Sequence, residues 1–305
     1  MKPPAVQPGA AIRLIAPASY ALDERVEHGL AALAALGFAP SLSANARTRG
    51  PLYFSGTPAE RLADLHAAFA DESTSAVMCL RGGYGSNYLL DALDLDLIAA
   101  HPKPFFGYSD LTGVQLHLLD KLGLPAFHGP MAAADFYLED GVHLESFRAA
   151  IEGRPYSVGA EEGLRTLRPG TARGMLYGGC LSILAALLGT PWEPRTEGKL
   201  LFLEDVAERP YRIDRLLWQL RKAGKFEGVT GIVFGEMMGC ADNGAPGMLE
   251  DGILSALDGI DVPIGFGLRS GHVSRQNVTL TFGVEAELDL GTKARLSLRE
   301  AAVKA

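Results

Sequence analysis

The sequence lacks the long apolar segments that membrane insertion and secretion require. It contains no run of about 18 apolar residues, so we do not expect a membrane-spanning helix. Its first residues, MKPPAVQPGAAIRLIAPAS, hold no extended apolar core of the kind that marks a secretory signal. We therefore expect a cytoplasmic protein that works without a membrane.

Cysteine and histidine are scarce, and neither forms a disulfide or metal-binding pattern. Cys79, Cys180 and Cys240 are widely spaced, and no C-x-x-C occurs. The seven histidines include no H-E-x-x-H pair. We therefore expect no disulfide framework, no metal ion and no cofactor.

The sequence also has fewer basic residues than acidic ones. The formal net charge is −8 at pH 7, with 28 Lys and Arg against 36 Asp and Glu. Nucleic-acid binding needs a basic surface that neutralises phosphates, so we expect no nucleic-acid partner. A small anionic ligand needs only a local positive site, so the net charge does not exclude such a ligand.

The glycine-rich segment LRGGYGS lacks the spacing G-x-G-x-x-G, which disfavours a dinucleotide-dependent dehydrogenase.

The first half of the chain alternates strand-like and helix-like segments. Short apolar runs that end at glycine or proline predict strands, and apolar positions at helical spacing between capping residues predict helices. The predicted strands lie within residues 11–19, 75–86 and 103–110, and the predicted helices span residues 23–37, 57–71 and 111–122. This alternation predicts an α/β fold with a doubly wound parallel sheet.

The pattern changes near residue 150. Residues 151–170 are rich in Gly, Arg and Pro and lack helical periodicity, so we expect a linker there. The linker would join an α/β domain of residues 1–150 to a β-rich domain of residues 171–305. In the second domain we expect a helix over residues 210–228, and NVTLTFGVEAELDLGTKARLSL alternates as strands do. A chain of 305 residues is long enough for two domains of ordinary size.

Ser109 lies in the segment GYSD, where a predicted strand meets a predicted helix. Backbone N–H groups at a helix N-terminus favour negative charge, which suits a serine alkoxide or the oxyanion that its attack creates. The same position also suits a helix cap, in which Ser109 or Asp110 accepts a backbone hydrogen bond. Taken alone, the segment favours the cap, because serine caps are far commoner than serine nucleophiles. The G-x-S-x-G signature of hydrolases is also absent.

The segment LRGGYGS, residues 80–86, places three glycines within four residues directly after a predicted strand. Glycines let the backbone approach a ligand closely, and their N–H groups can stabilise a developing negative charge. Taken alone, the segment favours an ordinary glycine turn.

Two further segments carry ionisable candidates. Glu204 and Asp205 end the apolar run LLFL, a position from which a carboxylate can orient a histidine. Solvated charges, or ion pairs with nearby arginines, are the alternative. His272, in the loop segment RSGHVSRQN, is a candidate general base because histidine titrates near neutrality, and His128 in PAFHGPM is its rival.

Together these segments resemble one family. LRGGYGSNYLLDALDLDLIAAHPKPFFGYSDLTGVQLHLL, LFLEDVAERPYRIDRLLWQL and GFGLRSGHVSRQNVTLTFG are similar to blocks of the LD-carboxypeptidases, serine peptidase family S66. IAPAS and GGCLSILAALLGTPWEP fit as well, so the resemblance spans nearly the whole chain. It implies an N-terminal domain like that of class I glutamine amidotransferases, a β-rich C-terminal domain, and a homodimer.

The resemblance also implies a catalytic site. The family uses a Ser-Glu-His triad, which corresponds to Ser109 as nucleophile, Glu204 as acid and His272 as base. Its oxyanion hole corresponds to the backbone N–H groups of Asp110 and Gly83, and Gly82 is a less favoured donor than Gly83.

The implied reaction is hydrolysis of the amide between an L-centre and a C-terminal D-amino acid. For a muropeptide, this releases D-alanine from a murein tetrapeptide during cell-wall recycling. Two other functions stay open: a microcin-immunity type peptidase of the same family, which cleaves aminoacyl- or peptidyl-nucleotide amides, and a non-catalytic small-ligand-binding protein.

A carboxypeptidase must also bind the terminal carboxylate of its substrate. Arg81, Arg269 and Arg275 lie beside the candidate loops, and each also fits a surface role. Tyr84 is a further candidate for substrate binding. Cys180 stands where the family often has Asn, which leaves the specificity of this chain open, and a buried apolar role fits this cysteine better than a nucleophilic one.

Overall fold

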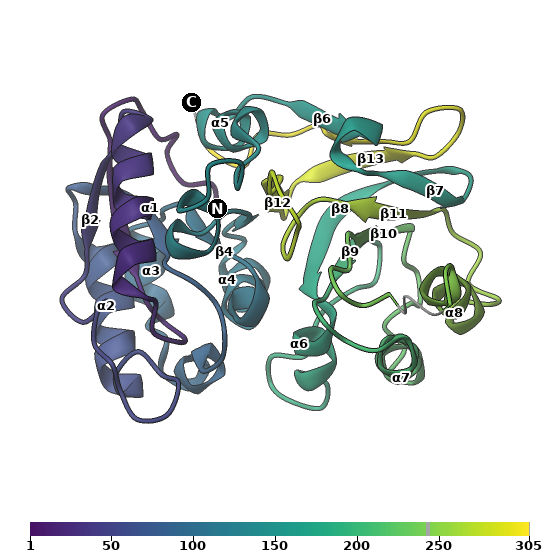
Figure 1. Ribbon diagram of the computed structural model, residues 1–305, viewed down its shortest axis with the longest axis horizontal. Helices are drawn as coiled ribbons and strands as arrows, with labels where there is room; N and C mark the ends of the chain where they lie inside the picture. The colour runs from purple at the N-terminus through teal and green to yellow at the C-terminus, as the bar shows by residue number, and fades with distance from the viewer. Residues whose placement is uncertain (242–244, 305) are drawn as a thin grey trace. The chain divides into compact units, whose positions relative to one another are not determined.

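A computed structural model describes residues 1–241 and 245–304, and the chain divides into two compact units (Figure 1). Unit 1 contains Met1–Arg154, Gln276–Gly283 and the C-terminal segment from Ala301. Unit 2 contains Pro155–Arg275 and Val284–Glu300. The chain therefore leaves unit 2 after Arg275, returns to it at Val284, and leaves it again after Glu300.

Unit 1 is built on a six-stranded sheet. In spatial order its strands are β12 (Leu280–Phe282), β5 (Ala126–His128), β4 (Phe105–Gly107), β3 (Thr74–Cys79), β1 (Ala11–Ile15) and β2 (Ala39–Leu42). The strands β1 to β5 run parallel, and β12 pairs antiparallel with β5. The order of the parallel strands reverses between β1 and β3, and ligands of such sheets bind beyond the carboxyl ends at this point.

Helices connect the parallel strands of unit 1, and two more follow the last of these strands, β5. They are α1 (Asp23–Ala35), α2 (Pro58–Ala70), η1 (Ser86–Ala92), α3 (Leu95–Ala100), η2 (Ser109–Leu111), α4 (Thr112–Leu122), η3 (Ala132–Phe136) and α5 (Leu144–Glu152). The start of α2 shows how the sequence sets these boundaries. Thr57 and Glu60 form a reciprocal capping box, and Pro58 occupies the first turn, where its missing N–H costs no hydrogen bond.

Unit 2 is built on an eight-stranded mixed sheet. In spatial order its strands are β6 (Tyr156–Gly159), β14 (Arg295–Leu298), β13 (Glu285–Asp289), β8 (Thr171–Cys180), β9 (Lys199–Glu204), β10 (Gly231–Gly235), β11 (Ile264–Leu268) and β7 (Arg165–Arg168). The central strands β8 to β11 run parallel, and the flanking strands are antiparallel. This unit therefore combines an α/β centre with β-rich edges.

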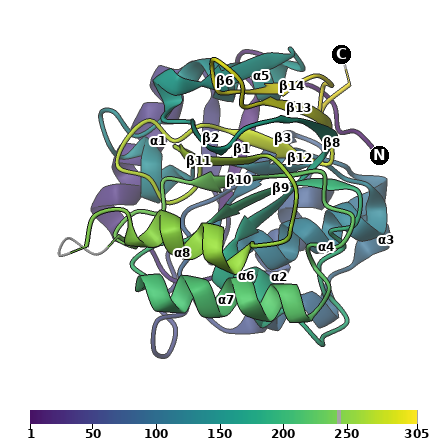
Figure 2. The ribbon, with the colours of Figure 1, turned by 90° about the vertical axis from the view of Figure 1, so that its right-hand side faces the viewer.

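The helices of unit 2 are η4 (Ala160–Glu162), α6 (Leu181–Ala186), α7 (Pro210–Lys222) and α8 (Met248–Ala256). Figures 1 and 2 show α7 and α8 side by side along the sheet of this unit. The helix α7 buries Ile213, Leu217 and Leu220, which recur at helical spacing, and the sequence predicted a helix from this pattern.

The fold class agrees with the expectation from sequence, but the expected boundaries differ. Residues 151–170 were expected to form a linker. They end α5 and then form β6, η4 and β7 of unit 2. These are short edge strands with partly exposed residues, so their Gly- and Arg-rich composition hides the alternation that reveals a strand. Residues 276–283, expected in the second domain, place β12 in the sheet of unit 1.

The described part of the chain contains no helix that is long and apolar enough to cross a membrane.

Candidate active site

Ser109 sits on a strained turn between β4 and the helical segment η2–α4. Its φ is +65°, a left-handed conformation that costs a residue other than glycine about 1–3 kcal/mol. Neither η2 nor α4 has a side-chain cap hydrogen bond, so the capping interpretation of Ser109 and Asp110 is wrong. A serine held on a sharp, strained strand-to-helix turn is the geometry of a nucleophile, although the G-x-S-x-G signature is absent.

The glycine loop, residues 81–86, approaches this turn closely. A Cβ on Gly82 would lie 2.8 Å from Ser109 Cβ and 3.0 Å from Ser109 Oγ, so only glycine fits there. In the described residues, neither Gly82 nor Gly83 uses its N–H group in a hydrogen bond, and Gly83 is exposed. The loop therefore offers N–H donors beside the serine, as an oxyanion hole requires.

Asp110 ties the glycine loop to the serine turn. Its carboxylate accepts a hydrogen bond from Ser86 N at 2.7 Å, and Ser86 Oγ donates to the carbonyl of Asp110 at 2.6 Å. The Asp110 side chain is buried, and this burial raises its pKa, while the hydrogen bonds from Ser86 act in the opposite direction. The side chain of Asp110 is thus occupied in fixing the loop and takes no part in capping.

Ser19, from the segment IAPAS after β1, holds the other side of the glycine loop. Ser19 Oγ accepts a hydrogen bond from Tyr84 N at 3.1 Å, and Ser19 N donates to Gly82 O at 3.4 Å. The carboxyl ends of β1, β3 and β4 thus contribute Ser19, the glycine loop and Ser109 to one region, where the topology of the sheet predicts a ligand.

In unit 2, a buried Glu204 pairs with a partly exposed His272. Glu204 is the last residue of β9, its side chain has no exposed surface, and its Oε2 lies 2.7 Å from His272 Nδ1. Glu204 Oε2 also accepts a hydrogen bond from His272 N at 3.0 Å. Because a carboxylate only accepts hydrogen bonds, Nδ1 carries the proton and Nε2 becomes the basic nitrogen of the ring.

Two glycines make room for this carboxylate. A Cβ on Gly271 would lie 2.6 Å from Glu204 Cδ, and a Cβ on Gly235 would lie 2.7 Å from Glu204 Cβ. Gly271 also has a φ of +88°, which favours glycine. The S-G-H sequence therefore lets the loop pass directly over Glu204 and brings the His272 ring to its carboxylate.

Asp205 has a different environment from Glu204. Its carboxylate accepts hydrogen bonds from Ser182 N at 2.8 Å and from Val206 N at 2.9 Å. Ser182 lies in the first turn of α6, where backbone N–H groups lack partners within the helix. Asp205 thus fixes the start of α6, and the expected alternative of solvated strand-end charges is wrong, because both carboxylates are buried.

The rival reactive groups lie in the core. His128 has no exposed surface, and its ring packs between those of Tyr108 and Phe282 in unit 1. Cys180 is buried at the end of β8, and burial raises the pKa of its thiol well above its usual range, with the charge of Glu204 as a further cause. A thiol held protonated in this way is a poor nucleophile.

The candidate substrate-binding residues lie in different surroundings. Arg81 and Tyr84 belong to the glycine loop, and within the described residues Arg81 forms no ion pair. Arg269 Nη2 donates to the carbonyl of Glu161 at 2.6 Å, so this guanidinium is partly engaged with the chain itself. Arg275 is exposed.

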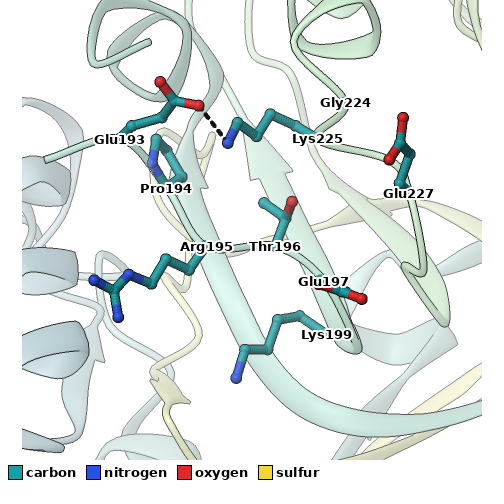
Figure 3. A pocket seen from close by; sticks show the side chains of 9 residues that line it. All are labelled: Glu193, Pro194, Arg195, Thr196, Glu197, Lys199, Gly224, Lys225 and Glu227. Carbon is teal, nitrogen blue, oxygen red and sulfur yellow. Dashed lines mark ion pairs between the residues drawn. The ribbon is translucent and has the colours of Figure 1, made fainter. Parts of the chain in front are cut away.

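A pocket of about 620 Å³ in unit 2 contains none of the candidate residues (Figure 3). It is lined by Glu193, Pro194, Arg195, Thr196, Glu197, Lys199, Gly224, Lys225 and Glu227. Glu193 and Lys225 form an ion pair at 2.5 Å across it. With mixed charge and neither a histidine nor a nucleophile, this pocket does not offer the groups that hydrolysis needs. Across residues 1–241 and 245–304, no group of three or more His, Cys, Asp or Glu is arranged to hold a metal ion.

Comparison with known families matches both halves of the chain. Residues 12–129 match the LD-carboxypeptidase N-terminal domain, and residues 173–288 match the LD-carboxypeptidase C-terminal domain. The chain belongs to the LD-carboxypeptidase family. It is therefore a serine-type carboxypeptidase, a hydrolase, and the alternative of a non-catalytic binding protein is wrong.

Two relatives of this LD-carboxypeptidase have names that refer to murein peptides. The chain is 36% identical to the probable murein peptide carboxypeptidase of Bacillus subtilis, over 96% of this chain and 92% of that protein. It is 34% identical to the murein tetrapeptide carboxypeptidase of Pseudomonas aeruginosa, over 91% of this chain and 92% of that protein.

Solved structures of LD-carboxypeptidase relatives have the same fold. An MccF-like protein from Bacillus anthracis superposes with a TM-score of 0.91 at 28% identity, covering 98% of this chain and 99% of that one. The muramoyltetrapeptide carboxypeptidase of Oxalobacter formigenes superposes with a TM-score of 0.85 at 29% identity, covering 96% of this chain and 99% of that one. The two-unit architecture is thus that of the family.

Sequence reasoning missed the residues that hold the glycine loop. Ser19 was noted only as part of IAPAS, and Ser86 only as the end of the glycine segment. A serine directly after a strand in a doubly wound sheet was the available signal, because the carboxyl ends of parallel strands meet at one edge.

Proposed function

We propose that Ser109, Glu204 and His272 form one catalytic triad, and that it hydrolyses the amide between an L-centre and a C-terminal D-amino acid. The observation that carries this proposal is the buried Glu204 carboxylate at 2.7 Å from His272 Nδ1, which leaves Nε2 as the base. The strained turn at Ser109 supports the same role for the serine.

The proposed reaction proceeds through an acyl-enzyme. His272 Nε2 takes the hydroxyl proton of Ser109 as Oγ attacks the carbonyl carbon, and Glu204 stabilises the imidazolium that results. His272 then gives this proton to the leaving amine, and the C–N bond breaks. In the second half, His272 takes a proton from water, the hydroxide attacks the ester carbonyl, and Ser109 recovers its proton.

Stabilisation of the oxyanion is assigned to the N–H groups of Gly83 and Asp110. Support comes from the N–H groups of Gly82 and Gly83, which donate no hydrogen bond in the described residues, and from the close approach of Gly82 to Ser109. One donor of this kind is worth about 3–4 kcal/mol of transition-state stabilisation in serine hydrolases.

We assign the terminal carboxylate of the substrate to Arg81. Arg81 belongs to the glycine loop and forms no ion pair with the described residues, whereas Arg269 already donates to Glu161 O. An arginine offers two parallel N–H donors to a carboxylate, which suits recognition of a free C-terminus. Tyr84, which is 39% exposed two residues beyond Gly82, is a further candidate contact.

The proposed substrate is a murein tetrapeptide, from which the enzyme releases D-alanine during cell-wall recycling. The names of the Bacillus subtilis and Pseudomonas aeruginosa relatives support this substrate class. A cytoplasmic homodimer that needs no cofactor belongs to the same proposal.

Product analysis by mass spectrometry tests the proposal. The wild-type protein is incubated with a defined tetrapeptide that ends in D-alanine and, as a control, with the same peptide ending in L-alanine. We expect a tripeptide and free D-alanine from the first substrate alone. Cleavage of both peptides, or of neither, contradicts the assigned specificity.

The similarity to the MccF-like protein favours one second candidate, a peptidase of the microcin-immunity type that cleaves aminoacyl-nucleotide amides. An aminoacyl sulfamoyl adenosine is therefore included as a third substrate. Its hydrolysis in place of the tetrapeptide would favour this second function while leaving the proposed triad unchanged.

A further inference from the structure

Arg61 is a buried charge within the otherwise largely apolar inner face of α2. It is 2% exposed, and the other buried residues of α2 are Asp64, Leu65, Ala68 and Phe69. Burying a guanidinium is costly unless hydrogen bonds compensate for the lost water. Burial lowers the pKa of Arg61, and the nearby charge of Asp110 opposes this effect.

One nitrogen of Arg61 joins two loops. Nη1 donates to Pro17 O at 2.6 Å and to Gly85 O at 2.7 Å, so it bridges the loop after β1 and the glycine loop after β3. Nε and Nη2 of Arg61 have no hydrogen-bond partner in the described residues. The interactions of this buried guanidinium are thus concentrated on these two carbonyl groups.

The structure around Gly85 is shaped for this contact. Gly85 has a φ of +125°, and a Cβ there would lie 2.7 Å from the Phe54 ring and 2.9 Å from Arg61 Nη1. The Phe54 ring also lies against the guanidinium, whose central carbon is 5.1 Å from the ring centroid. Arg61 therefore occupies a position that the glycine loop leaves open by having no side chain at Gly85.

These contacts continue to the nucleophile. Arg61 holds Gly85, Ser19 holds Gly82 and Tyr84, and Asp110 holds Ser86 next to Ser109. Each contact fixes main-chain atoms of the same six-residue loop, which carries the proposed oxyanion donor. Since a displacement of about 1 Å at a reacting centre can cost about a hundredfold in rate, the position of this loop matters for chemistry.

We propose that Arg61 is a positioning residue for the oxyanion loop: by binding Pro17 O and Gly85 O, it fixes the glycine loop against the Ser109 turn. This inference rests on the proposed function for its catalytic consequence, although the fixing of the loop is a property of unit 1 alone. Arg61 acts through the loop and makes no contact with substrate.

The test compares Arg61→Met with Lys103→Met. Lys103 is also a buried cation, and its Nζ donates to the carbonyl of Phe69 in the last turn of α2. Each variant loses a buried cationic hydrogen-bond donor: Arg61 belongs to α2, and Lys103 binds the last turn of α2. Of these two residues, only Arg61 binds the glycine loop. The control therefore separates a general loss of stability from a loss of loop position.

Two measurements are made on each folded variant. Amide hydrogen exchange of a peptide covering residues 81–88 is expected to speed up about tenfold in Arg61→Met and to stay at the wild-type rate in Lys103→Met. On the D-alanine tetrapeptide, kcat is expected to fall by about tenfold to a hundredfold in Arg61→Met with KM within about threefold, and Lys103→Met is expected to keep wild-type kcat. Arg61→Lys, which keeps a cationic donor, is expected to recover part of kcat.

Equal exchange and equal kcat in the two Met variants would overturn the proposal, and so would faster exchange without a loss of kcat. If the wild type does not cleave the tetrapeptide, the proposed function fails, while the exchange measurement still decides whether Arg61 fixes the loop. Should Arg61→Met not fold, Ser19→Ala removes the acceptor of the Tyr84 N–H and is measured in the same two ways. A Ser19→Ala protein with wild-type exchange and kcat would then count against the network.

Discussion

The Ser109 turn in unit 1 and the His272 loop in unit 2 differ in what holds the reactive side chain. Main-chain geometry holds Ser109: its φ is +65°, and the neighbouring glycine loop is fixed through backbone atoms. A side-chain contact holds His272, because the Glu204 carboxylate binds both its ring and its N–H. The backbone conformation thus positions the proposed nucleophile, and a buried carboxylate positions the proposed base.

This difference predicts where each region is vulnerable. The His272 region should be most sensitive to removal of a single functional group, the Glu204 carboxylate. The Ser109 region should be most sensitive to added atoms, because glycines let its segments pack closely together.

The largest effect is expected at Glu204. Glu204→Ala removes the group that fixes the Nδ1 proton and stabilises the imidazolium, so kcat should fall by about 10⁴-fold. Asp205→Ala is the matched control: it should lower the melting temperature, because Asp205 binds the start of α6, while kcat falls far less. Equal losses of kcat in the two variants would leave the acid unassigned.

A smaller effect is expected from one added methyl group in unit 1. In Gly82→Ala the new Cβ would lie 2.8 Å from Ser109 Cβ, so the loop or the serine must move, and kcat should fall by about 10²-fold. Gly252→Ala in α8 is the control, because no atom lies within 4 Å of the added Cβ. Steady-state kinetics give the kcat of both variants. A wild-type kcat in Gly82→Ala would refute close packing between Gly82 and Ser109.

The smallest effect is expected at Asp71, where a substitution should change the melting temperature and leave kcat unchanged. The Asp71 carboxylate accepts hydrogen bonds from Arg13 and from the hydroxyl and N–H groups of Ser73. The Ser73 hydroxyl is the largest cause of the lowered pKa of Asp71, and Arg13 is the next. Because the folded pKa lies below the unfolded value of about 3.9, this stabilisation is present above about pH 4 and is lost as the pH falls.

Asp71→Asn should therefore lower the melting temperature at pH 7 slightly, and the difference from wild type should shrink at pH 3. Its kcat should stay at the wild-type value, because Asp71 belongs to neither reactive region. A difference in melting temperature that grows as the pH falls would contradict the assigned sign.

Much of the fold was predictable because local signals and the global fold agree. The capping box at Thr57 and the helical spacing of Ile213, Leu217 and Leu220 each set an element where the structure has it. The edge strands β6 and β7 were missed, because partly exposed strands with glycine and arginine carry no clear alternation. The return of β12 to unit 1 was missed because pairing with the distant strand β5 leaves no local trace.

The candidate residues were predictable only as a set. GYSD alone favoured a helix cap, because a serine residue does not indicate that its φ is left-handed. The distinct environments of Glu204 and Asp205 depend on the neighbours Gly271 and Ser182, which sequence spacing does not reveal. Arg61 was missed although a charge among Leu65, Ala68 and Phe69 was a visible irregularity of α2.

We propose that Ser109, Glu204 and His272 act together in catalysis. The most direct test measures kcat on the D-alanine tetrapeptide for Ser109→Ala, His272→Ala and the double variant. Groups that act together are non-additive, so we predict that the double variant retains the same residual kcat as Ser109→Ala alone. A double variant whose loss equals the product of the two single losses, or a Ser109→Ala protein with wild-type turnover, would contradict the account.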